Sequence, residues 1–164
     1  MDVRTGTAAQ LWQSSLVHVQ QRLHLRLSEN QESYLVFLLI RHARDVALGG
    51  RTMALELLQA LEAPGGVGDD RLRDVGDRCL LLAGLFPGLR HRRHVDAVYY
   101  QHLGRTAYGL LGERGQGGLA RLYAELACAY GDLVRVLLGL RGETGAAAGA
   151  APVTLRDMAV LGNA

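Results

Sequence analysis

Apolar residues recur at spacings of three and four along nearly the whole chain. This period places them on one face of an α-helix, whereas strands would alternate apolar and polar residues and be rich in Val, Ile and Thr. The sequence contains no stretch of that second kind. The pattern therefore predicts an all-α fold, a single-domain bundle of about six helices.

The first two helices are predicted over residues 8–27 and from Glu29 to about Val46. The first has one apolar stripe, formed by Trp12, Leu16, Val19, Leu23 and Leu27. Ser28 and Gln31 match a capping box that would start the second helix. The second contains LVFLLI, which is apolar on every side, so we expect it to be the central helix, surrounded by neighbours.

Three further helices are predicted in the middle of the chain. One covers residues 51–62 and is broken by the Pro- and Gly-containing segment 63–68. The next runs from about Asp70 to Phe86, where Pro87 and Gly88 end it. The third starts at Asp96, a suitable N-cap, and ends before the sequence ERGQGG.

Gly104 lies beside the apolar stripe of the helix that starts at Asp96. Glycine lowers helix stability by about 1 kcal/mol relative to alanine. We therefore expect a close helix crossing or a packed aromatic side chain at this position.

A sixth helix is predicted over residues 119–140, with a bend at Gly131. Residues 142–151 are nearly all Ala and Gly and predict a flexible linker. Residues 152–164 form a short apolar segment, which either docks on its own domain, a twin subunit or another protein, or remains a mobile tail. The predicted organisation is thus a helical domain over 1–141, a linker and a C-terminal segment.

The charged residues limit the classes of function. The chain has 164 residues, of which 49% are hydrophobic and 21% charged, as expected for one folded domain. All its basic side chains are Arg, so lysine Schiff bases and Walker-type phosphate lysines are excluded. The net charge of +2, with acids and arginines interspersed, makes a nucleic-acid partner an unfavoured interpretation.

The segment 89–94, LRHRRH, is a local exception because it carries Arg90, Arg92 and Arg93 without an acid. A solvated turn between helices is the favoured interpretation. Contact with an anion or an acidic partner is the alternative.

Cys79 and Cys128 stand in apolar helical contexts without CxxC or metal spacing, which predicts reduced thiols. Residues 1–9 lack the apolar core of a signal peptide, and the longest apolar run, Leu35 to Ile40, is too short to cross a membrane. We therefore expect a cytoplasmic protein without membrane contact.

The sequence does not favour a metal or haem site. His91, His94, Asp96 and His102 lie within twelve positions, but their spacing matches no specific metal motif. Four histidines are each only a weak candidate for an axial haem ligand, namely His18, His24, His42 and His102. GxSxG and cysteine–histidine patterns are also missing from the sequence. The sequence thus predicts no metal, no cofactor and no catalytic residue.

A polar network is the main candidate site. The residues concerned are Asp77, Tyr99, Tyr100, His102 and Arg105, on the two helices that flank LRHRRH. They could line a ligand-binding pocket between these helices. Alternatively, Asp77 and Arg105 form a buried ion pair that fixes how the helices pack, which is the favoured interpretation.

The segments GDRCLLLAGLFP and VYYQHLGRTAYGLL resemble a pattern in a group of uncharacterised bacterial proteins. The matching residues are Gly76, Asp77, Gly84, Phe86, Pro87, Tyr99, Tyr100, Gly104, Ala107 and Tyr108. The resemblance covers about a fifth of the chain and implies no known activity. It indicates where a special feature of the chain lies.

Together these observations favour a non-catalytic protein-interaction or regulatory module that forms a homodimer. The dimer is expected from the density of apolar helical surface and from the apolar C-terminal segment. The alternative is a helical bundle that binds a ligand or cofactor through the polar network.

Overall fold

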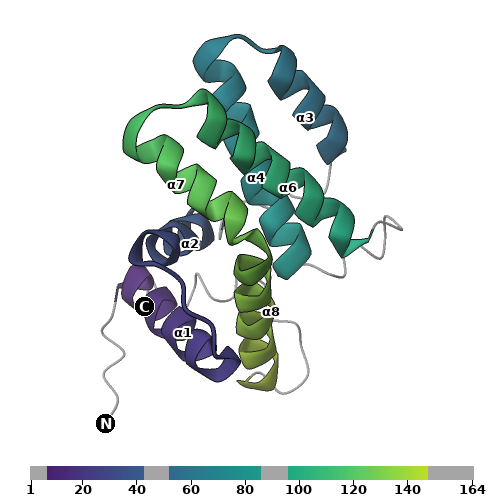
Figure 1. Ribbon diagram of the computed structural model, residues 1–164. Helices are drawn as coiled ribbons and strands as arrows, with labels where there is room; N and C mark the ends of the chain where they lie inside the picture. Colours follow the sequence, from purple (N-terminus) through teal and green to yellow (C-terminus); the bar gives the residue numbers. More distant parts are fainter. Residues whose placement is uncertain (1–6, 43–51, 86–95, 148–164) are drawn as a thin grey trace. The chain divides into compact units, whose positions relative to one another are not determined.

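The computed structural model describes residues 7–42, 52–85 and 96–147, with the side chains of residues 143–147 excepted. Within these ranges the chain forms seven α-helices and no strand, which confirms the predicted all-α fold (Figure 1). The helices are α1 (Ala8–Leu23), α2 (Glu29–His42), α3 (Met53–Glu62), α4 (Gly65–Gly84), α6 (Ala97–Arg114), α7 (Gly117–Cys128) and α8 (Tyr130–Ala147).

The contacts between residues divide the chain into two compact units. Unit 1 contains Met1–Val46 and Gly139–Ala164, and unit 2 contains Ala47–Leu138. Helix α8 contributes to both, because its first half belongs to unit 2 and its second half to unit 1. The stretch 1–141, predicted as one domain, therefore contributes to two compact units.

In unit 1, α1 packs against α2 and buries Trp12, Leu16 and Val19. Helix α1 ends at Leu23, four residues earlier than predicted, because His24 adopts a left-handed conformation with φ of 53°. The side chain of Gln20 then accepts a hydrogen bond from the backbone N–H of Leu27 at 2.7 Å. Leu27 stays buried, as its place in the apolar stripe predicts, although it lies outside the helix.

Helix α2 starts with the predicted capping box. The backbone N–H of Gln31 donates to the Ser28 hydroxyl at 3.2 Å, and the backbone N–H of Ser28 donates to the Gln31 side chain at 2.9 Å. The expectation that α2 is surrounded by neighbours is wrong, because the Phe37 side chain is 63% exposed and Ile40 is also exposed. Helix α2 packs through one face, which carries Leu35, Leu38 and Leu39.

In unit 2, α4 packs against α6, α6 packs against α7, and α3 packs against α4 and α6 (Figure 1). Helix α4 begins at Gly65, five residues before the predicted start at Asp70. The glycine segment is helical because Gly68 lets the first turn approach the end of α3. A Cβ at Gly68 would lie 2.7 Å from the Ala63 carbonyl oxygen and 2.9 Å from that of Ala60.

The sixth predicted helix, 119–140, is two helices in the structure. Helix α7 ends at Cys128, Ala129 has φ −89° and ψ 7°, and α8 starts at Tyr130. The helix therefore breaks rather than bending at Gly131. Helix α8 continues to Ala147, so part of the predicted linker, 142–147, is helical. The predicted C-terminal segment, 152–164, lies outside the described residues.

Candidate functional site: a buried aspartate among tyrosines

Asp77 is a buried acidic residue in the middle of α4, with only 2% of its surface exposed. The hydroxyl of Tyr108, on α6, donates a hydrogen bond to its Oδ1 at 2.6 Å. A buried carboxyl needs such a donor, since removing it from water without a partner is strongly unfavourable. The bond connects the two helices with the most extensive packing in unit 2.

Two more tyrosines surround this bond. Tyr130, the first residue of α8, donates its hydroxyl to the backbone carbonyl of Gly76 at 2.9 Å. The ring of Tyr108 lies with its centroid 5.5 Å from that of Tyr130 and 5.5 Å from that of Tyr123 on α7. Asp77 of α4 therefore sits beside a cluster of tyrosines that come from α6, α7 and α8.

Two glycines make room for the rings. A Cβ at Gly76 would collide with the ring of Tyr108, and a Cβ at Gly104 would collide with the hydroxyl of Tyr130. The Gly104 Cβ would also lie 3.0 Å from the Cβ of Cys79. The predicted packed aromatic at Gly104 is thus confirmed, and tyrosine side chains fill the space that both glycines leave open.

Burial also determines the protonation of two neighbouring groups. It raises the pKa of Tyr130 well above its ordinary value, the charges of Cys79 and Asp77 raise it further, and Arg105 lowers it. Burial likewise raises the pKa of the Cys79 thiol. A neutral thiol and a neutral phenol are poor nucleophiles, so neither residue is prepared for covalent catalysis near neutral pH.

The residues predicted as a polar network differ in how far they are buried. Asp77 and Tyr100 are buried, whereas Tyr99, His102 and Arg105 are exposed on α6. The rings of Tyr99 and Tyr100 meet edge to face, with centroids 5.4 Å apart. The hydroxyl of Tyr108, a residue outside the predicted network, donates a hydrogen bond to Asp77. Arg90, Arg92 and Arg93 lie outside the described residues.

Sequence reasoning missed Tyr108, Tyr123 and Tyr130 as members of the cluster. A signal for Tyr108 was present, because Tyr100, Gly104 and Tyr108 follow one another at intervals of four and so share a face of α6. A tyrosine on a buried face needs a partner for its hydroxyl. The partner itself, 31 positions away on another helix, has no local signature.

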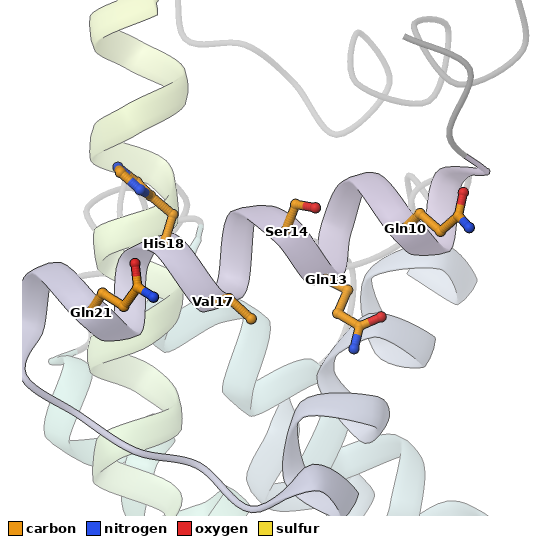
Figure 2. A pocket seen from close by; sticks show the side chains of 6 residues that line it. All are labelled: Gln10, Gln13, Ser14, Val17, His18 and Gln21. Atoms are coloured by element: carbon orange, nitrogen blue, oxygen red, sulfur yellow. The ribbon is translucent and has the colours of Figure 1, made fainter.

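An open pocket runs along one face of α1 in unit 1 (Figure 2). Its described lining comes from α1 only and consists of Gln10, Gln13, Ser14, Val17, His18 and Gln21. These positions follow a spacing of three and four, which makes them one mainly polar stripe with Val17 as its apolar member and His18 as its single titratable group. Such a stripe offers hydrogen bonds but neither a carboxylate nor a thiol for chemistry.

The described part of the chain holds no group of three or more His, Cys, Asp or Glu side chains that could bind a metal ion. Among its helices, none is both long and apolar enough to span a membrane. Comparison of the chain with protein-family models, curated proteins and solved structures finds no match.

Proposed function

We propose that this protein is a non-catalytic protein-interaction module and that the outer face of α3 is its binding surface. Three leucines on this face point into solvent, with exposed fractions of 53% for Leu55, 57% for Leu58 and 40% for Leu61. We call these three residues the leucine surface. Their exposure is the observation that carries the proposal.

Helix α3 is apolar nearly all round. Its ten residues, MALELLQALE, include only Glu56, Gln59 and Glu62 as polar side chains. Met53, Leu57 and Ala60 form its buried face, and the leucine surface is left over. A helix that is apolar on most sides is normally surrounded by other elements, so the leucine surface supports docking of another protein.

The adjoining turn extends the apolar character of this region. Val67, in the first turn of α4, is 56% exposed and follows α3 in sequence after a short connection. In contrast, the residues around Asp77 are packed against one another, which favours a structural role for them over ligand binding. The proposed interaction surface therefore lies on α3 and not between α4 and α6.

Affinity capture tests the proposal. The full chain and a Leu55→Glu/Leu58→Glu variant are immobilised and exposed to a lysate of the native host, and bound proteins are quantified by mass spectrometry. We expect at least one protein to be enriched about tenfold or more on the wild type and lost on the variant, since about 1.4 kcal/mol of lost binding suffices for that factor.

A matched control is Leu119→Glu, which places the same charge on an exposed leucine of α7. This control should retain the captured protein. If the wild type and the double variant capture identical sets of proteins, the leucine surface is not a binding surface and the proposal fails.

A cytoplasmic location, a bacterial origin, a regulatory role and the family resemblance stay predictions.

A further inference from the structure

We infer that the leucine surface is occupied by a second copy of this chain, with the two α3 helices antiparallel about a two-fold axis. This inference rests on the proposed function, because it names the partner of the same surface. It is carried by the chemistry of the two ends of α3. Glu62 at the C-terminal end of one copy can supply the capping acceptor that Thr52 of the second copy does not provide.

The C-terminal end of α3 carries a misplaced negative charge. Glu62 is the last residue of the helix and is exposed, and the last turn holds no basic residue. The carbonyl groups at a helix C-terminus already give that end a partial negative charge, so a carboxylate is unfavourable there. Within the described ranges, Glu62 makes no ion pair that would offset this.

The N-terminal end of α3 has one acidic residue in its first turn, Glu56, but no side-chain cap. Thr52 is the N-cap, but its side chain makes no capping hydrogen bond. The first N–H groups of a helix have no partner within the helix and give this end a partial positive charge. A carboxylate is a suitable acceptor for such groups, which is why acidic residues are favoured at helix N-termini.

Antiparallel pairing brings these two ends together twice. With α3 running from Met53 to Glu62, Glu62 of one copy lies beside Met53 of the second copy, and the reverse holds at the other end. The two Leu58 side chains then lie near the axis, with Leu55 and Leu61 on either side. Parallel pairing would instead place the two Glu62 carboxylates next to each other, which is repulsive.

The position and the length of α3 determine how strong this dimer can be. Figure 1 shows α3 at the edge of unit 2, where it packs against α4 on its inner side. A ten-residue helix is about 15 Å long, so α3 gives an interface smaller than the roughly 800 Å² per partner of a stable complex. We therefore expect reversible dimerisation, with a dissociation constant of about 10 µM or weaker.

Sedimentation velocity of the full chain tests the inference between about 1 and 200 µM, a range that brackets the expected constant. The wild type should shift from monomer to dimer. Leu58→Glu should remain monomeric, and Leu119→Glu should dimerise like the wild type. Glu62→Lys, which reverses the charge at the end of α3, should weaken dimerisation about tenfold. Circular dichroism verifies that each variant is folded.

Cross-linking tests the two-fold geometry. In a Cys128→Ser background, which removes the exposed native thiol, Leu58→Cys should be linked to itself by a short bismaleimide, and Leu119→Cys should not. Cross-linking of Leu119→Cys with equal yield would contradict the arrangement. An unchanged dimerisation constant for Glu62→Lys would contradict the proposed pairing of the helix ends.

The two proposals fail in distinguishable ways. A wild type that stays monomeric at every concentration overturns self-pairing. If that monomer still captures another protein through the leucine surface, the interaction function stands and only the identity of the partner is wrong. If it dimerises and Leu58→Glu does not alter this, the dimer uses another surface and the inference is rejected.

Discussion

At the level of single residues, Gly76 and Gly104 determine how closely the helices of unit 2 approach. Each glycine leaves room for a tyrosine from another helix, because a Cβ would collide with it. Tyr108 packs at Gly76, and Tyr130 packs at Gly104. Gly109, also on α6, differs from both, because a Cβ there would meet no atom within 4 Å. The same residue type thus has two different roles within one helix.

Replacing these glycines should give opposite results. Gly104→Ala should lower the free energy of unfolding by about 1–3 kcal/mol, because the new methyl group overpacks the space held by Tyr130. Gly109→Ala should be neutral or stabilising by up to about 1 kcal/mol, because alanine favours the helix. Urea unfolding measures both. Equal effects of the two substitutions would show that Gly104 is not a packing position.

At the level of elements, Gln20 connects α1, the following loop and α2. Its Nε2 donates to the Glu32 carboxylate at 2.8 Å, and its Oε1 accepts from the Leu27 backbone N–H at 2.7 Å. Gln20 is itself buried, although glutamine is normally exposed. This one side chain therefore fixes the path by which the chain leaves α1 and enters α2.

Gln20→Leu should destabilise unit 1 by about 1–3 kcal/mol, because the substitution leaves the buried Leu27 N–H without its acceptor. Trp12, the single tryptophan, is buried in α1 and reports unfolding of this unit by fluorescence. Gln21→Leu, at the adjacent exposed position, is the control and should leave the transition unchanged. A Gln20→Leu transition that matches the wild type would mean that water replaces the lost bonds.

Sequence patterns predicted the helices better than their ends. The apolar stripes and the caps at Ser28 and Asp96 are local features, and the structure confirms both caps, with the Asp96 carboxylate accepting from the Val98 N–H at 3.3 Å. The ends that were wrong depend on contacts between elements. The glycine segment before Asp70 is helical because of the neighbouring α3, and α1 ends early where Gln20 binds the loop.

At the level of the whole molecule, sequence reasoning found Asp77 as a special position but did not find the tyrosines that surround it. Tyr99, His102 and Arg105 are close to one another in sequence, and they are exposed. The tyrosines that surround Asp77 come from three later helices. No single periodicity could reveal that convergence, because it depends on how α4, α6, α7 and α8 pack.

The stability of the molecule should fall in alkaline solution. Burial raises the pKa of Cys79 and of Tyr130 above their ordinary values of 9.0 and 10.0. The unfolded chain releases the Cys79 proton above about pH 9 and the Tyr130 proton above about pH 10, while the folded chain keeps both, so rising pH favours unfolding. Each group then lowers the free energy of unfolding by about 1.4 kcal/mol per pH unit.

Urea unfolding of wild type, Cys79→Ala and Cys128→Ser between pH 7 and 11 checks this dependence. Between about pH 9 and 10, Cys79→Ala should make the free energy of unfolding fall less steeply with pH, by the amount that corresponds to roughly one proton. This holds even if the smaller side chain lowers stability at every pH. Cys128→Ser serves as the comparison that removes the exposed thiol instead of the buried one. Identical slopes for all three proteins would show that Cys79 ionises equally in both states.

The pairing of Gly76 with Tyr108 and of Gly104 with Tyr130 also limits how the sequence can evolve. A larger residue at either glycine is tolerated only if the opposing ring becomes smaller in the same lineage. Homologous chains that keep this fold should therefore show these positions changing in pairs. A designer who grafts α6 into another bundle would have to transfer α4 and the start of α8 with it.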